Sequence, residues 1–129
     1  MGLFGNREEK RAKEAAAEAE SERLAALPVA DLAAEIMPAF GPGGIEVRGG
    51  HQRGAMQVTE WLFASTSDKV KYRQPVLGPT IEALQALENA GLLSRRNFGG
   101  SGSSASTYEA TRAGTEALAE DSVRQRLGT

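Results

Sequence analysis

The chain has 129 residues, of which 40% are hydrophobic, and its formal net charge is −2 at pH 7. This length suits one domain and is too short for two ordinary ones. The absence of cysteine excludes disulfides and thiol catalysis, and a single histidine excludes a histidine-rich metal site. No apolar run approaches the length of a membrane span and no signal peptide is visible, so we expect a cytoplasmic protein with no membrane partner and no cofactor.

Charge is distributed unevenly along the chain. Residues 43–112 carry eight basic and six acidic side chains, whereas the two flanks together carry seven basic and eleven acidic ones. The middle is therefore mildly basic and the ends are acidic. This small excess is compatible with a nucleic-acid partner but does not predict a strong electrostatic hold on one.

The N-terminal segment, residues 1–27, is predicted to be a helical arm because residues 7–27 are almost all good helix formers. Its large apolar residues are confined to Leu24 and Leu27 within that stretch, so no heptad seam drives a coiled coil. We expect a solvated, fraying arm whose deletion up to residue 24 leaves the remaining domain, residues 28–129, folded. An arm used for docking or dimerisation is the alternative.

The next stretch predicts a helix over residues 29–40 and a short edge strand over 45–48, with glycines and a proline between them. These glycines do not form a phosphate loop because no Gly-Lys-Ser/Thr follows them. His51 has no acidic or hydroxyl partner at catalytic spacing, so we expect a surface histidine.

A second amphipathic helix is predicted from Gln52 to Ala64, with five large apolar residues available for the core: Met56, Val58, Trp61, Leu62 and Phe63. The run that follows, residues 69–74, fits a short helix or a strand, because Val70 and Tyr72 alternate with basic residues. We favour the helix.

The stretch from residue 77 to 96 predicts a helix followed by a strand. Pro79 suits a first helical position, and Ile81, Leu84 and Leu87 recur at three-residue spacing as one apolar stripe. Gly91 can take the left-handed conformation that ends a helix. Strands are predicted at 92–98 and 106–111, joined by a Gly/Ser loop that contains no Lys or Arg. A C-terminal helix is predicted from Thr115 to Leu127.

Two of these segments resemble a known family. The segment TIEALQALENAGLLSRR is similar to the third helix and second strand of winged helix-turn-helix proteins of the PadR and MarR kind. The segment STYEATRAGTEAL resembles the returning strand and next helix of the same families, where Tyr-x-x-Thr-x-x-Gly is typical; here these residues are Tyr108, Thr111 and Gly114.

This resemblance implies a mainly α fold with a small β-hairpin, namely a winged helix-turn-helix domain preceded by the N-terminal helical arm. It also implies a sequence-specific DNA-binding transcriptional regulator that forms a homodimer and is not an enzyme. Double-stranded DNA is the expected partner, and no metal is expected.

The helix that begins at Pro79 would then be the recognition helix. With Ile81, Leu84 and Leu87 inward, the outward set is Thr80, Glu82, Ala83, Gln85, Ala86 and Asn89. Amide and hydroxyl side chains on this set can reach base edges, and the flanking basic and aromatic side chains can hold phosphates. The predicted DNA-binding residues are Lys69, Lys71, Tyr72, Arg73, Thr80, Gln85, Asn89, Arg95 and Arg96.

The alternative is a winged helix that contacts another protein and does not bind DNA. The two glutamates of the predicted recognition helix, the uncharged loop between the strands and the negative net charge favour this alternative. An enzyme is disfavoured because no nucleophile–base pair, carboxylate pair or cofactor fingerprint stands out.

Overall fold

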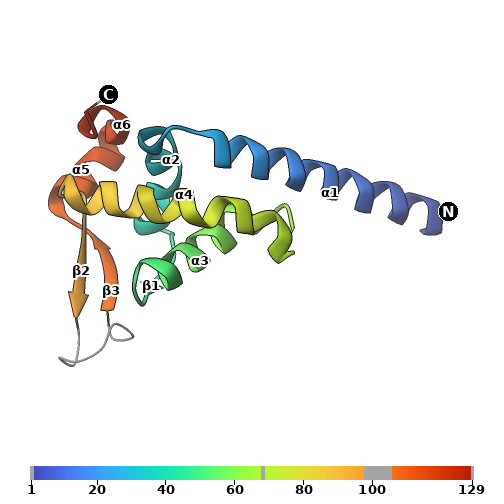
Figure 1. The fold of residues 1–129 in the computed structure, drawn as a ribbon, viewed down its shortest axis with the longest axis horizontal. Helices are drawn as coiled ribbons and strands as arrows, with labels where there is room; N and C mark the ends of the chain where they lie inside the picture. The colour runs from blue at the N-terminus through green and yellow to red at the C-terminus, as the bar shows by residue number, and fades with distance from the viewer. Residues whose placement is uncertain (1, 68, 98–105, 129) are drawn as a thin grey trace.

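Helix α4 (Val70–Asn89) runs through the middle of the structure, and the other elements are arranged around it (Figure 1). The computed structural model describes residues 2–67, 69–97 and 106–128. The other elements are, in order, α1 (Gly2–Ala26), α2 (Val29–Ile36), the 3-10 helix η1 (Met37–Phe40), β1 (Val47–Arg48), α3 (His51–Leu62), β2 (Leu93–Asn97), β3 (Ser106–Ala110), α5 (Arg112–Glu120) and α6 (Val123–Arg126). The predicted fold class, mainly α with a small β-hairpin, is confirmed.

The strands form one antiparallel sheet in the order β1-β3-β2. β2 and β3 make the predicted hairpin, in register from Leu93 opposite Ala110 to Asn97 opposite Ser106. The two-residue strand β1 adds to the other side of β3, with Val47 opposite Tyr108. The predicted Gly/Ser loop falls mainly in residues 98–105, which lie outside the described part of the chain.

Helix α4 is held by a buried stripe along its whole length. The stripe consists of Tyr72, Val76, Thr80, Ala83, Leu84 and Leu87, at the three- and four-residue spacing of one helix face. It packs against α1, α2 and α3. Gly91, with φ at 77°, ends the helix as predicted, and the Leu92 N–H donates to the Leu87 carbonyl at 2.9 Å.

The predicted start of this helix at Pro79 was wrong. Residues 70–89 form one helix of 20 residues with Pro75 and Pro79 inside it, so the favoured helix at 69–74 is its first part. Each proline removes a backbone hydrogen bond. Gly78 has no Cβ to collide with the Pro79 ring, and burial of Tyr72 and Val76 on the common stripe favours a continuous helix.

Two helix predictions need smaller corrections. The C-terminal helix is interrupted at Asp121, whose φ of 53° is left-handed, and so becomes α5 and α6. In α3, Val58 and the following Phe63 are fully buried, as expected, but Met56 is 54% exposed and Trp61 is only partly buried. The buried side of α3 therefore carries smaller residues, Ala55 and Thr59, in place of the tryptophan.

Helix α1 is helical as predicted, but the expectation that it has no face to bury was wrong. Ala17 and Leu24 are fully buried in the same core as α4, and Ser21 is 5% exposed. Small side chains at this spacing let two helices approach closely without a stripe of large apolar residues. Only the N-terminal half of α1 projects beyond the rest of the molecule (Figure 1).

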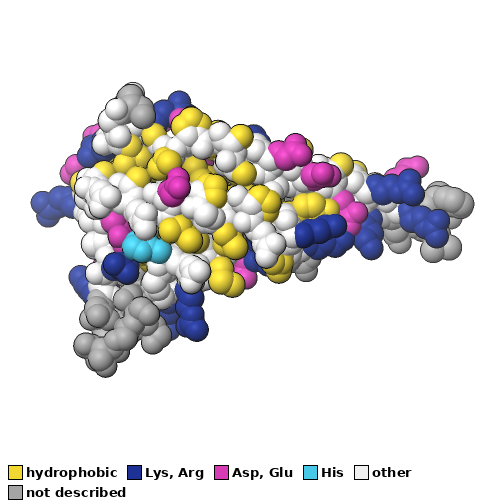
Figure 2. Space-filling model, viewed as in Figure 1, with side chains coloured by type: hydrophobic (Ala, Val, Ile, Leu, Met, Phe, Trp, Pro, Cys, Tyr) yellow, Lys and Arg dark blue, Asp and Glu magenta, His cyan; other side chains and the backbone are white. Residues whose placement is uncertain are grey.

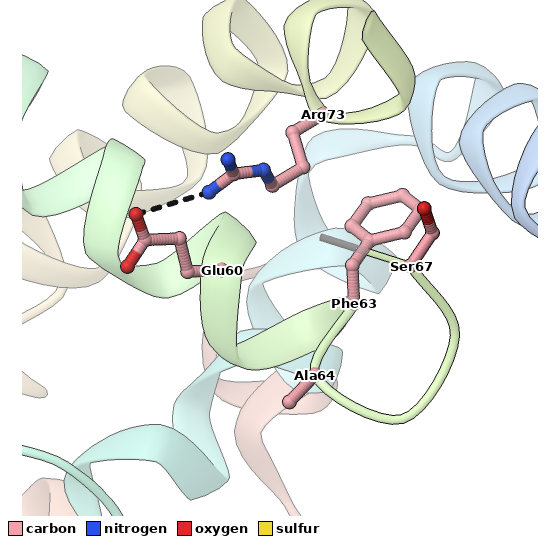
Figure 3. A pocket seen from close by; sticks show the side chains of 5 residues that line it. All are labelled: Glu60, Phe63, Ala64, Ser67 and Arg73. Atoms are coloured by element: carbon pink, nitrogen blue, oxygen red, sulfur yellow. Dashed lines mark ion pairs between the residues drawn. The ribbon is translucent and has the colours of Figure 1, made fainter. Parts of the chain in front are cut away.

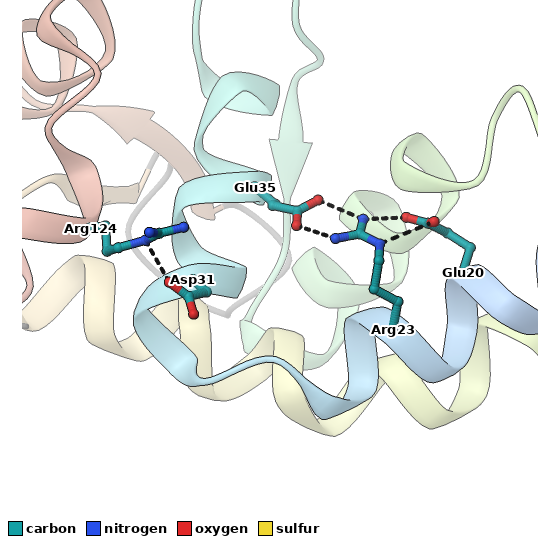
Figure 4. Close-up of polar contacts among 5 residues, drawn as sticks. All are labelled: Glu20, Arg23, Asp31, Glu35 and Arg124. Carbon is teal, nitrogen blue, oxygen red and sulfur yellow. Dashed lines mark hydrogen bonds and ion pairs between the residues drawn. The ribbon is translucent and has the colours of Figure 1, made fainter.

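A polar contact fixes α1 to α2 at the point where α1 ends (Figure 4). The Arg23 guanidinium donates to both carboxylate oxygens of Glu35, at 2.6 and 2.8 Å, and also pairs with Glu20. Hydrogen bonding from Arg23 lowers the pKa of Glu35 below its ordinary value. Arg124 of α6 pairs with Asp31 on the same helix, so α1 and α6 are both anchored on α2.

The motif Tyr108, Thr111 and Gly114 has a structural explanation. Tyr108 is 4% exposed in the core. The Thr111 hydroxyl accepts from the Gly114 N–H at 3.0 Å and donates to the Gly91 carbonyl at 2.5 Å, so it caps α5 and joins it to the end of α4. A Cβ at Gly114 would clash with the Leu92 carbonyl and would lie 2.9 Å from Met37 Cε.

We therefore expect Gly114→Ala to lower the free energy of unfolding by about 1–3 kcal/mol or more, because backbone cannot move aside as a flexible side chain can. Gly50→Ala is the matched control, since a Cβ at Gly50 meets nothing within 4 Å, and should change stability by less than about 1 kcal/mol. Equal denaturant midpoints for the two variants would contradict the close packing of α5 on the Leu92 backbone.

Truncations test the revised role of α1. Removal of residues 1–9 should leave the melting transition in place, because between Arg7 and Ala26 the first buried residue of α1 is Ala17. Removal of residues 1–24 also deletes Leu24, which alone should cost about 2–5 kcal/mol. Thermal melts of equal midpoint for both truncations would show that α1 does not belong to the core.

The Arg23–Glu35 contact predicts a pH dependence. Because the folded-state pKa of Glu35 is lowered, its contribution to stability is present above the unfolded-state pKa and is lost as the pH falls through the folded value. Relative to Glu35→Gln, the wild type should be more stable by about 1 kcal/mol at pH 7, a value kept small because Glu35 is 35% exposed.

This difference should begin to fall near the unfolded-state pKa of about 4.3 and should be lost as the pH falls through the lowered folded-state pKa. Glu116→Gln, on the exposed surface of α5, should not alter the pH profile of unfolding beyond about 0.5 kcal/mol. A constant gap between wild type and Glu35→Gln from pH 7 to pH 3 would rule out the contact as its source.

Candidate nucleic-acid interface

The side of α4 opposite its buried stripe is open to solvent. Its exposed side chains include the predicted base-reading residues Gln85 and Asn89, and Glu82, one turn before Gln85. The exposed residues of α4 include one basic side chain, Lys71, and one acidic side chain, Glu82. The others are Val70, Gln74, Pro75, Gly78, Gln85 and Asn89. Figure 2 shows this surface as mainly uncharged over α4, with basic and acidic side chains intermixed along the projecting α1 and further basic side chains near the hairpin.

Two predicted outward positions, Thr80 and Ala83, were wrong, and Tyr72, predicted to hold a phosphate, is buried as well. Thr80 and Ala83 are fully buried, and Tyr72 is 9% exposed. Tyr72 and Val76 set the phase of the stripe from the first half of α4, and continuing that phase brings positions 80 and 83 inside. Thr80 is thus a core residue whose hydroxyl oxygen has no hydrogen-bond partner within the described structure, and it cannot reach a base.

The basic residues near the start of α4 have different surroundings. Lys71 is exposed, with its ammonium nitrogen 5.0 Å from the centre of the Tyr72 ring. Lys69 pairs with Glu14 of α1. The Arg73 side chain is only 14% exposed and its Nη1 lies 3.1 Å from Glu60, beside a recess lined by Phe63 and Ser67 (Figure 3). Arg73 therefore joins α3 to α4 rather than presenting its charge outward.

Near the end of α4, Arg95 and Arg96 lie on opposite faces of β2, as successive strand residues do. Arg95 Nε is 3.0 Å from Glu88, and Arg96 Nε is 3.6 Å from Glu109. Their side chains remain 40% and 63% exposed, so both can meet a ligand. A phosphate would have to compete with a carboxylate at each of them.

A polar cluster that the sequence did not reveal lies between α3, α4 and the sheet. His51 Nε2 is 3.0 Å from Glu88, which also pairs with Arg95, and the His51 ring lies 6.1 Å from the Tyr108 ring. Burial raises the pKa of Tyr108 to about 12, with Glu88 adding to the shift. His51, expected on the surface, is part-buried and helps to hold the hairpin against α4.

Two other features of the described residues concern metal ions and membranes. Within residues 2–67, 69–97 and 106–128, no group of three or more His, Asp or Glu side chains is arranged to hold a metal ion. In that same part of the chain, no helix has both the length and the apolar character needed to cross a membrane.

Comparisons with protein-family models, with curated proteins and with solved structures found no match for this chain. The candidate interface is the outward face of α4. Basic residues of α4 and α1 lie at one end of this face, and basic residues of β2 lie at the other end.

Proposed function

We propose that this chain is a winged helix-turn-helix protein of the PadR/MarR kind that binds double-stranded DNA in a sequence-specific way as a transcriptional regulator. The observation that carries this proposal is the arrangement of α2, β1, α3, α4 and the β2–β3 hairpin, with α4 buried on one side and open on the other. An exposed helix face of this kind fits the major groove, which is about 12 Å wide.

The base-reading part of the proposal rests on Gln85 and Asn89. They are four residues apart on the exposed face, so they lie one above the other along the helix. Both side chains can donate and accept toward the edge of adenine, and the nearby Glu82 can accept from cytosine. Thr80 takes no part because it is buried.

The phosphate-binding part rests on exposed basic residues at the two ends of α4. Lys71 lies at the beginning, and Arg95 and Arg96 follow the end. The 20 residues of α4 separate these groups by about 30 Å at 1.5 Å per residue. The carboxylates of Glu88 and Glu109 offset part of the charge, so we expect modest affinity with a shallow salt dependence.

The proposal includes a homodimer, as the family resemblance implies, and a cytoplasmic location where the DNA of a regulated promoter is accessible. Its role is binding rather than catalysis. A dimer would present two α4 helices to two half-sites, which a light-scattering mass measurement and a footprint on DNA can test together.

One observation favours a second function, a winged helix that contacts a protein. Among the exposed residues of α4, Lys71 and Glu82 are the two that carry a charge, and these charges are opposite. The exposed face is therefore close to neutral. A neutral, mainly uncharged helix face suits a protein partner as well as it suits a base edge.

DNA binding by fluorescence anisotropy separates these functions. Arg96→Ala should weaken binding to all duplexes alike and lower the slope of log affinity against log salt by about 0.9, as loss of one phosphate contact does. Arg112→Ala, which removes the same charge from the exposed start of α5, should leave that slope unchanged. Gln85→Ala should instead reduce the preference among sequences, by about 1–3 kcal/mol.

A folded dimer that binds no duplex at about 50 mM salt would exclude the regulator and leave the protein-contact function. Equal losses for Arg96→Ala and Arg112→Ala would show a general charge effect and would remove Arg96 from the interface.

A further inference from the structure

A basic recess lies where the projecting half of α1 passes the loop between α3 and α4. We call it the basic notch: it has a volume of about 380 Å³ and is lined by Lys10, Lys13 and Glu14 of α1, by residues 64–67 and by Lys69. Three of its lining residues are lysines and one is acidic. Asp68, next to it in the chain, lies outside the described residues.

The described side chains that line the notch carry more positive than negative charge. Glu14 pairs with Lys69, and this hydrogen bond and charge lower the pKa of the Glu14 carboxyl, with further lowering by Lys71 and Lys10. Several ammonium groups thus act on the one described carboxylate of the notch. An anion that entered would meet the same groups.

The notch also offers uncharged donors. Ser65, Thr66 and Ser67 contribute hydroxyl groups, and the Ser67 oxygen already accepts from the Lys69 N–H at 3.2 Å, which leaves its own proton available to donate. Lys69 is the residue that precedes the 20-residue helix α4, and its own side chain makes no capping hydrogen bond. The positive end of the helix dipole adds to the field of the lysines.

The construction of α1 explains why these lysines are held here. The buried face of α1 contains Ala17, Ser21 and Leu24. Its helical spacing continues toward the N-terminus through Lys10, Lys13 and Glu14, so the notch lies on the same side of α1 as the face that packs against α4. The buried half of α1 fixes the direction of the projecting half. Lys10 and Lys13 are thereby positioned beside the start of α4 although 55 residues separate Glu14 from Lys69.

We propose that the basic notch binds a backbone phosphate of the DNA that the outward face of α4 contacts, so that α1 acts as a phosphate clamp beside the recognition helix. This inference rests on the proposed function. Three ammonium groups and adjacent hydroxyls suit a phosphodiester, which offers acceptor oxygens and one negative charge without requiring a base contact.

The matched pair of variants for the test lies within α1. Lys10→Gln/Lys13→Gln removes two charges from the notch, and Arg7→Gln/Arg11→Gln removes two charges from exposed positions of the same helix that do not line it. Anisotropy titrations of a labelled duplex with the full chain should show the salt slope reduced by about 0.9 for the lysine variant, as loss of one phosphate contact does. The arginine variant should reduce it by less than half as much. Equal reductions would overturn the notch in favour of a diffuse positive field.

A second measurement does not depend on DNA. Inorganic phosphate added to the ¹⁵N-labelled chain should cause saturable shifts of the Lys13, Ser67 and Lys69 amides, absent in Lys10→Gln/Lys13→Gln and absent with chloride at equal ionic strength. Absence of these shifts in the wild type would overturn the notch even if DNA binds elsewhere.

Two further outcomes separate this inference from the proposed function. Saturable shifts with phosphate but no duplex binding would remove the proposed function and the DNA clamp while leaving a phosphate site. Binding to vesicles that contain phosphatidylserine, with no duplex binding and with loss in the lysine variant, would assign the phosphate to a lipid headgroup and overturn the DNA assignment.

Discussion

Burial of one side of α4 is the constraint on which the rest of the structure depends. Its stripe from Tyr72 to Leu87 contacts α1, α2 and α3, and the β2–β3 hairpin follows shortly after its end. Because one face is fully engaged, the opposite face is left to solvent over about five turns of helix. A long helix that is held this firmly from behind can present side chains at fixed positions, and this property suits recognition of a regular ligand such as a DNA groove.

The second constraint is charge balance. Each of Lys69, Arg73, Arg95 and Arg96 has a carboxylate partner, which fixes its side chain and reduces the local positive potential. Lys69, Arg95 and Arg96 are exposed, and ion pairs at exposed sites add little to stability, typically less than about 1 kcal/mol, so a phosphate can displace their carboxylates at modest cost. The projecting half of α1 supplies additional lysines at the end of α4 where Arg73 is turned inward.

Local signals allowed the hairpin and the stop at Gly91 to be predicted from sequence, because each depends on neighbouring residues. The motif Tyr108, Thr111 and Gly114 was found through the family resemblance, and its contacts with Gly91 and Leu92 come from tertiary packing. The phase of α4 could not be predicted once Pro79 had been taken as a boundary, and this error turned Thr80 outward. The His51–Glu88 contact joins residues 37 apart, and α1 is buried through Ala17 and Ser21, which carry little hydrophobic signal. In these cases tertiary packing decides the outcome.

The central claim is that the outward face of α4 lies against DNA, and site-specific photo-crosslinking tests it most directly. A photoreactive residue placed at position 85 of α4 should crosslink to duplex DNA, and the same residue at position 116, exposed on α5, should not. Crosslinks of equal yield from both positions, or crosslinks from position 116 alone, would contradict the account.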